Sequence, residues 1–215
     1  MKRMIALASA ALLTMSLLSG CGDKAPADDG TSTAAPEQTE SATADLGTSD
    51  YNEYPELSEV KQLSVHPIYL NIPALRTEDW GYSFVISDSL DYAIVVTTDT
   101  DAHPGESIND IFPTLFNGDQ KGVLMQFYRA DYDDFEPENT THFTLVSGNE
   151  ALRFEGVQTA DDYGTAVSFD VTGYAFMFND YPVIVSVFSK DTDDAKVDEL
   201  IRYVDEMVQT VRSER

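Results

Sequence analysis

The chain has 215 residues, which is enough for one ordinary domain together with extensions. Its 38 acidic and 13 basic residues give a formal net charge of -25, and this excess of negative charge excludes a nucleic-acid groove because it would repel phosphates. Hydrophobic residues make up 42% of the chain, which is enough to bury a core, so we expect a folded, acidic domain. The single cysteine excludes a disulfide within the chain and any metal cluster held by thiolates.

The first twenty residues have the pattern of a bacterial lipoprotein signal peptide. A positive start precedes the mostly apolar residues 4–18, and the lipobox before Cys21 consists of Leu18, Ser19 and Gly20. An apolar stretch of roughly 15 residues is short for a permanent span, which needs about 20. We therefore expect cleavage before Cys21 and lipidation of its thiol by acyl chains such as palmitate. The alternative is an uncleaved anchor with a chance cysteine.

Lipidation at Cys21 predicts an extracytoplasmic protein that is held on a bacterial membrane by acyl chains. Residues 21–56 follow, and they are mainly Asp, Ala, Thr, Ser, Gly, Pro and Glu. Such a segment cannot bury enough surface to offset its ordering entropy, so we expect a disordered acidic tether with a reach of roughly 30 to 35 Å. The tether would carry the acidic domain beyond the screening length of about 8 Å at an anionic membrane.

The globular domain is predicted to span residues 57–215, and its first half combines short strands with one helix. Residues 82–86 and 92–96 predict two strands joined across residues 87–89. A short helix is predicted over residues 108–116, with Ser107 as its cap, Pro113 as a kink and Gly118 as its stop signal.

Alternating apolar residues after this helix predict half-buried antiparallel strands. The inward-facing sets are Val123, Met125 and Phe127; Phe143 and Leu145; Leu152 and Phe154; and Val167, Phe169 and Val171. Residues 174–188 predict a hairpin whose turn includes residues 179–182. Because its strands are apolar on both faces, each face of the sheet should be covered.

The C-terminal region predicts a helix with one apolar stripe. Residues 191–194 supply its cap and negative charge at its positive end, and Arg212 lies at its other end. The stripe consists of Val197, Leu200, Ile201, Val204, Met207, Val208 and Val211. This helix would cover one face of the sheet, and the helix at 108–116 with the segment 63–75 would cover the other. We therefore expect a three-layer α/β/α sandwich with a mainly antiparallel central sheet.

The order of these elements resembles that of the PsbP-like family over most of residues 69–215. The resemblance includes the strand sequence Gly-Asn-Glu-Ala-Leu-Arg-Phe at 148–154 and the ending Tyr-Val-Asp-Glu-Met-Val-Gln-Thr-Val at 203–211. That family includes extrinsic photosystem subunits, a small Ran-binding nuclear-import factor and many bacterial lipoproteins. The resemblance implies a non-enzymatic accessory module. It rests on element order and not on an invariant motif, so it assigns no functional residue.

The sequence lacks the common signatures of catalysis. It contains neither Gly-x-Ser-x-Gly nor a glycine-rich phosphate loop. His66, His103 and His142 are far apart, and none has a partner at the spacing of a helical zinc site, so surface or packing roles are expected for them. We expect no enzymatic activity.

Two groups of side chains are candidates for ligand binding. Residues 131–139 are rich in carboxylates that could hold calcium weakly, but they lack the turn glycine and the terminal glutamate of a calcium loop. A solvated acidic loop between two strands is the better account, and Asp99 with Asp101 forms a smaller version of the same pattern. The candidate calcium ligands are Asp131, Asp133, Asp134 and Glu136.

The second group is aromatic. Trp80, Tyr82 and Tyr92, with Phe112 and Phe116 on the predicted helix, could line a binding face for an amphipathic partner. Core packing of these rings is the preferred interpretation. The expected function is a non-catalytic binding or accessory module for a protein or another envelope component. A lipoprotein that binds a small ligand or calcium weakly is the second interpretation, and an enzyme of unknown class is the third.

Overall fold

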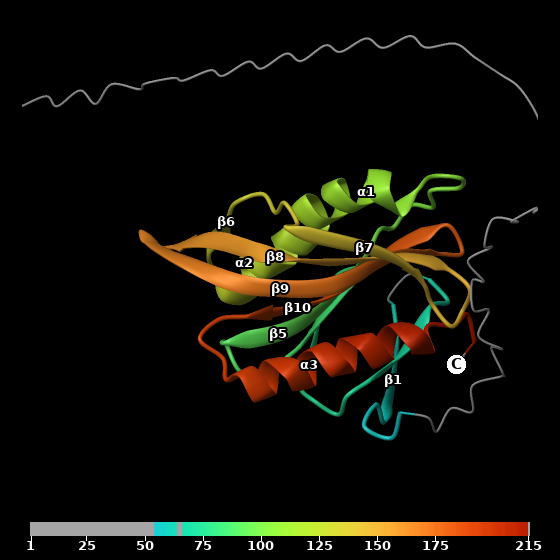
Figure 1. The fold of residues 1–215 in the computed structure, drawn as a ribbon, viewed down its shortest axis with the longest axis horizontal. Helices are drawn as coiled ribbons and strands as arrows, with labels where there is room; N and C mark the ends of the chain where they lie inside the picture. The colour runs from blue at the N-terminus through green and yellow to red at the C-terminus, as the bar shows by residue number, and fades with distance from the viewer. Residues whose placement is uncertain (1–53, 64–65, 215) are drawn as a thin grey trace, which may run out of the picture. The chain divides into compact units, whose positions relative to one another are not determined.

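A computed structural model describes residues 54–63 and 66–214 (Figure 1). The predicted signal peptide, the lipobox, Cys21 and the tether as far as residue 53 lie outside the described residues. Within the described ranges, no helix is both long enough and apolar enough to cross a membrane.

The centre of the domain is an eight-stranded sheet in which every neighbouring pair is antiparallel. β8 and β9 are its longest strands, and β7 and β6 pair with different stretches of β8. The strands run across the sheet in the order β3 (Thr77–Trp80), β4 (Ser83–Ile86), β5 (Tyr92–Thr98), β10 (Tyr181–Ser189), β9 (Thr165–Phe178), β8 (Glu150–Asp162) and β6 (Asp131–Tyr132), with β7 (Asn139–Thr144) also on β8.

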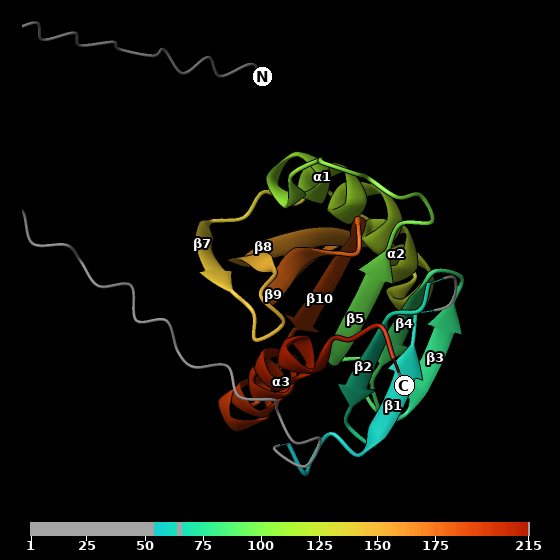
Figure 2. The same cartoon turned by 90° about the vertical axis from the view of Figure 1, so that its right-hand side faces the viewer.

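Helices cover both faces of this sheet (Figure 2). One face carries α1 (Ile108–Leu115), a π-helical turn (Phe116–Gln120) and α2 (Lys121–Tyr128). The other face carries α3 (Asp194–Met207), which continues as a 3₁₀ turn (Val208–Thr210), and the small antiparallel pair of β1 (Glu59–Gln62) and β2 (Tyr69–Ile72). The predicted three-layer α/β/α sandwich is therefore confirmed.

Strand alternation divides the interior into two cores. On β10, Val183, Val185 and Val187 belong to the core beneath α3, whereas Ile184 and Phe188 belong to the core beneath α1 and α2. Successive side chains of a strand point to opposite faces, so a strand that is apolar on both faces serves both cores. The apolar residues on both faces of the hairpin at 174–188 predicted this arrangement, in which each face of the sheet is covered.

The predicted start of the C-terminal helix is confirmed. The Asp193 side chain caps α3 by accepting a hydrogen bond from the Ala195 amide over 2.9 Å. The buried residues Leu200, Val204 and Met207 belong to the predicted stripe. The predicted strands at 82–86 and 92–96 are also present, and Ile86 pairs with Ile94 between β4 and β5.

The strand predicted from Val123, Met125 and Phe127 is wrong, because these residues belong to α2. Val123 and Leu124 are buried, whereas Met125 is exposed, which is a helical pattern of burial. Alternation over so few residues fits period 2 and period 3.6 about equally well. Gly118 does not stop the helix either, because the π-helical turn carries the backbone directly from α1 into α2.

The segment 63–75 packs on the opposite face from the one that was predicted. Leu63, Ile68 and Leu70 belong to the α3 core, and the backbones of Tyr69 and Arg212 pair beside them. Within the described residues, the helices of the second covering layer are α1 and α2, joined by the π-helical turn. Tyr54, which precedes the predicted start of the domain at residue 57, also packs against the α3 core.

Candidate functional site

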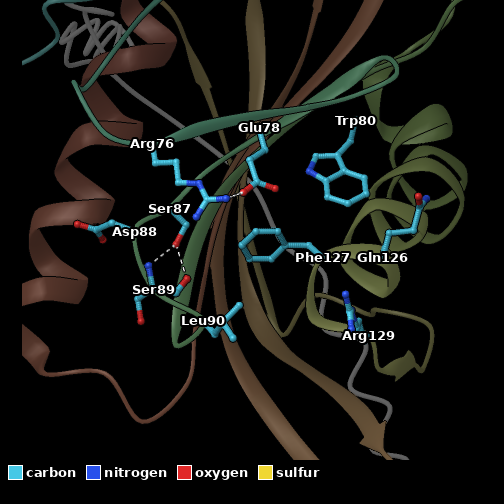
Figure 3. Close-up of a pocket in the computed structure, with 10 residues that line it drawn as sticks. All are labelled: Arg76, Glu78, Trp80, Ser87, Asp88, Ser89, Leu90, Gln126, Phe127 and Arg129. Atoms are coloured by element: carbon cyan, nitrogen blue, oxygen red, sulfur yellow. Dashed lines mark hydrogen bonds and ion pairs between the residues drawn. The ribbon is translucent and has the colours of Figure 1, made fainter.

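Two adjoining cavities of about 390 and 770 Å³ form a hollow that we assign as a candidate site, and Figure 3 shows the residues that line the first of them. They lie between β3, the β4–β5 loop, the C-terminal end of α2 and the β8–β9 turn. Three residues, Trp80, Gln126 and Arg129, line both cavities and therefore mark where the two meet. We call this combined surface the Trp80 groove. Each cavity has the size of a typical ligand site.

The alternation of β3 places its even-numbered side chains in the groove. Glu78 is opposite Val85, which belongs to the α1/α2 core, and Trp80 packs against that same core. Asp79 is opposite Phe84, which belongs to the α3 core, and on that face it forms an ion pair of 2.6 Å with Lys61. The groove face of β3 therefore presents Trp80 and Glu78, and Arg76, just before the strand, lines the first cavity with them.

Arg76 and Glu78 form an ion pair along this face of β3, as Figure 3 shows. The Arg76 side chain is 72% exposed, so the pair lies at the rim of the first cavity and contributes little to folding. The two charges nearly neutralise each other within the groove. The net charge that the groove offers a ligand therefore depends on its other charged residues.

Arg129 ends α2 in the left-handed backbone conformation, with φ 58° and ψ 35°. Glycine is the usual residue at such a helix end because a side chain makes this conformation unfavourable. Among the lysines and arginines that the structure describes, Arg129 is the one whose charged group forms no ion pair, cation–π contact or hydrogen bond. Arg129 is exposed, and it lines both cavities.

Large apolar side chains are exposed along the same groove. Leu90 is 64% exposed and lines the first cavity, whereas Met125 and Tyr163, at 37% and 90%, line the second. The indole nitrogen of Trp80 is buried and has no hydrogen-bond partner. The groove thus combines exposed apolar surface with a cation that forms no ion pair, a combination that suits an amphipathic ligand.

The structure does not bring the predicted aromatic face together. Trp80 lies in the groove, but Tyr92 packs against the α3 core on the opposite face of the sheet. The Lys196 ammonium lies over the Tyr92 ring at 5.3 Å from its centroid, and the Tyr92 hydroxyl bonds to Asp88. Tyr82 is 46% exposed in the turn between β3 and β4.

Phe112 and Phe116 of the predicted aromatic set are buried, and they belong to the α1/α2 core. Phe116 stacks on Phe135 with their centroids 4.4 Å apart, and Phe112 contacts Phe154 at 4.7 Å. Core packing, the preferred interpretation, is therefore correct for these two rings.

The predicted calcium ligands lie in or beside the loop that joins β6 to β7, but they point to different partners. Asp133 accepts a hydrogen bond of 2.6 Å from the Thr159 hydroxyl, and Asp134 pairs with Lys121 at 2.7 Å. Asp131 lines the second cavity, and Glu136 is exposed. Among the residues described, no three or more histidine, cysteine or acidic side chains are grouped so that they could hold a metal ion.

Two of the three histidines meet at Asp99, between the end of β5 and α1. His66 is buried, and its Nε2 lies 2.9 Å from the backbone oxygen of Asp99, while its ring stacks on Tyr181. His103 Nε2 lies 3.0 Å from the Asp99 carboxylate, and its Nδ1 lies 3.5 Å from Glu106. His142 is exposed on β7.

The Asp99–His103 pair shifts both pKa values. The hydrogen bond to Asp99 raises the pKa of His103 above its ordinary value, against a smaller opposing effect of burial. Burial raises the pKa of Asp99, but hydrogen bonds from the Asp101 backbone and from His103 outweigh burial, so the net pKa is lowered. Asp99 and Asp101, predicted as a minor calcium pattern, form a local hydrogen bond of 3.1 Å within this loop.

Sequence reasoning missed most of the Trp80 groove. Its exposed apolar residues come from three separate segments, and the sequence gives no sign that these meet. One signal was available, because Tyr163 precedes Gly164 in a polar turn between two strands, where a tyrosine has no core to fill. Arg129 carries no comparable signal.

No protein-family model matches this chain, and none of the curated proteins is similar to it in sequence. Among solved structures, it is similar to the Ran-binding protein Mog1p of Saccharomyces cerevisiae, with 12% identity, a TM-score of 0.41, and coverage of 72% of this chain and 94% of that one. A Pseudomonas aeruginosa protein of unknown function has 12% identity and a TM-score of 0.36, over 71% and 94% of the two chains. A Bacteroides thetaiotaomicron protein has 10% identity and a TM-score of 0.41, over 72% of this chain and 48% of its own.

Mog1p is a Ran-binding protein, and the PsbP-like family, which the order of elements resembles, includes a Ran-binding import factor. With identities of 12% or less and TM-scores below 0.5, these similarities say nothing about what this chain binds or does. The fold class is instead established by the strands and helices of this structure, an antiparallel sheet with a C-terminal helix packed on it.

Proposed function

We propose that this chain is an extracytoplasmic lipoprotein, held on a bacterial membrane by acyl chains on Cys21, and that its folded domain is a non-catalytic binding module. Its partner is a protein or another component of the cell envelope. The Trp80 groove is the surface that binds this partner. The anchor follows from the lipobox at residues 18–20, and the binding role follows from the groove.

The observation that carries the binding role is the set of exposed apolar side chains around Arg129. Single exposed apolar residues are normal on a protein surface, but a group of them around one hollow is typical of an interaction site. Leu90, Met125 and Tyr163 border the same groove. Arginine and aromatic residues are also the types that contribute most to binding at interfaces.

The surroundings of the histidines support a non-catalytic role. In the described part of the chain, His66 and His103 contact Asp99, and neither has a serine or threonine hydroxyl within hydrogen-bond distance. A nucleophilic hydrolase would need such a pair. We therefore expect the domain to act by holding its partner and not by chemical conversion.

A comparative pull-down tests the proposal. The full chain, tagged at its C-terminus, is expressed in its native host and recovered from solubilised membranes, and its stoichiometric partners are identified by mass spectrometry. The groove variant carries Leu90→Ser and Met125→Ser, whereas the control carries Val60→Ser and Val146→Ser. The control residues are 42% and 37% exposed and line neither groove cavity, so both variants remove exposed apolar groups.

We expect a partner that is captured by the wild-type chain and by the control variant but lost with the groove variant. Equal capture by both variants would show that the groove is not the binding surface. A turnover activity of the purified protein that disappears on one side-chain substitution would contradict the non-catalytic role.

A further inference from the structure

Arg129 occupies the middle of the Trp80 groove. It lines both cavities, as do Trp80 and Gln126, so a ligand that filled the whole groove would pass over its guanidinium. A group that binds Arg129 would therefore lie within the ligand and not at its end. The position of Arg129 therefore suits the side chain of an internal residue of the ligand and not a carboxylate at the end of the ligand.

The charge of Arg129 is available in a chain that has a large excess of carboxylates. With 38 acidic and 13 basic residues, a surface arginine would be expected to have an acidic neighbour. Among the described residues no carboxylate forms an ion pair with Arg129, although Asp131 and Asp161 line the second cavity with it. Arg129 also lies at a helix end where its backbone conformation favours glycine. A guanidinium binds a carboxylate through two parallel hydrogen bonds, so the complementary ligand group is a carboxylate.

Apolar surface lies on both sides of this arginine. Leu90 is on the side of the first cavity, and Met125 with Tyr163 is on the side of the second. A complementary segment would carry apolar side chains before and after its acidic residue. Each cavity has room for such a side chain, at about 390 and 770 Å³.

Two carboxylates limit how acidic this segment can be. Asp131 of β6 is directly opposite Asp161 of β8, and both line the second cavity. Like charges in directly opposed positions repel each other, so this side of the groove would repel a further acidic residue. The complementary segment therefore has one acidic side chain and not a cluster.

From this juxtaposition we propose that the Trp80 groove binds a short peptide segment of a partner protein, in which one internal aspartate or glutamate pairs with Arg129 and apolar side chains on both sides fill the two cavities. This inference rests on the proposed function and specifies the chemistry of the partner.

Selection from a random peptide library tests the inference. Heptapeptides displayed on phage are selected on the immobilised full chain, and the selected sequences are synthesised with a fluorophore and blocked ends. Each acidic peptide is compared with its counterpart in which glutamate or aspartate is replaced by glutamine or asparagine. Fluorescence anisotropy then gives the dissociation constants for the wild-type chain, for Arg129→Gln and for Arg202→Gln. Arg202 is the control because it is an exposed arginine on α3, on the other face of the sheet.

We expect selected peptides with one internal acidic residue between apolar residues, and about tenfold weaker binding when that residue is made neutral. Arg129→Gln should weaken the acidic peptide by a similar factor and leave the neutral peptide unchanged, whereas Arg202→Gln should change neither. Thermal unfolding of each variant checks that it remains folded, and Arg129→Lys, which retains the charge, should restore part of the preference.

Peptides that bind in the groove without preferring an acidic residue would overturn this inference and leave the proposed function intact. Binding there would be recognised by its loss with Leu90→Ser and Met125→Ser. A pull-down partner that depends on the groove, together with no selected peptide, would also overturn the inference alone. Failure of the groove variants to affect any captured partner or peptide would contradict both.

Discussion

Gly173 lies where the central strands approach most closely, and its replacement by alanine should destabilise the fold strongly. Gly173 of β9 is opposite Phe154 of β8 and Ser186 of β10. A Cβ atom there would lie 2.5 Å from the carbonyl oxygen of Val185, 2.7 Å from the Ser186 Cβ and 2.8 Å from Phe154 Cζ. The carbonyl cannot move without disturbing the sheet, and Phe154 is fully buried. Overpacking of a core costs about 1–3 kcal/mol, and we expect the upper end of that range.

Urea unfolding of the purified protein measures this loss. With a slope of about 1–3 kcal/mol per molar urea, the midpoint should fall by about 1 M or more for Gly173→Ala, with an unchanged slope. The matched control is Gly122→Ala on α2, where a Cβ would have no atom within 4 Å and alanine favours the helix by up to about 1 kcal/mol. Equal midpoints for Gly173→Ala and the wild type would refute the packing of β8, β9 and β10 described above.

Further predictions concern two hydrogen-bonded pairs and the anchor. Because Asp99 raises the pKa of His103, their pair stabilises the fold fully below the ordinary histidine pKa of about 6.5 and loses this effect as the pH rises through the raised value. His103→Gln should therefore lower the unfolding midpoint more at about pH 5.5 than at about pH 8.5; an equal loss at both would contradict the pairing. Burial, and then the hydrogen bond of 2.6 Å donated to Asp205, raises the pKa of Tyr174 to about 12. Tyr174→Phe should remove from an ultraviolet pH titration one tyrosine that ionises above the ordinary tyrosine pKa, and it should lower the free energy of unfolding by about 1 kcal/mol. An unchanged titration curve would contradict the raised pKa of Tyr174. Cys21→Ser should release the protein from the membrane fraction and remove its acyl mass, so retention like that of the wild type would exclude the anchor.

The elements that could be predicted from the sequence are those whose pattern is long or apolar on both faces. The C-terminal helix has a stripe over several turns and a cap at Asp193, and the structure confirms its start. The β9–β10 hairpin could be predicted because its strands serve both cores. The layers followed from these two elements, since each apolar face has to be covered.

Short elements were less predictable. α2 has only eight residues, and the alternation of Val123, Met125 and Phe127 hid the adjacent pair Val123 and Leu124 that faces the core. β3, with the polar sequence Thr-Glu-Asp-Trp at the sheet edge, has no apolar alternation to reveal it. The local pattern in both cases is weaker than the tertiary packing that fixes the element.

The candidate site could be predicted only in part, because it is formed by segments that are distant in sequence. Trp80 was identified from its residue type, but its predicted companion Tyr92 lies on the other face of the sheet. Arg129 and Tyr163 come together with Trp80 only through the order of the strands and the packing of α2. The unpaired state of Arg129 is a property of the folded surface that no local pattern contains.

Site-specific photo-crosslinking in the native host tests the role of the Trp80 groove most directly. A benzophenone amino acid is introduced at position 125, which lines the groove, or at position 146, which does not. Met125 and Val146 are both 37% exposed, so the two probes have equal access to solvent. The proposed function predicts one discrete crosslinked partner from position 125 and none from position 146. The same product from both positions, or a product from position 146 alone, would contradict it.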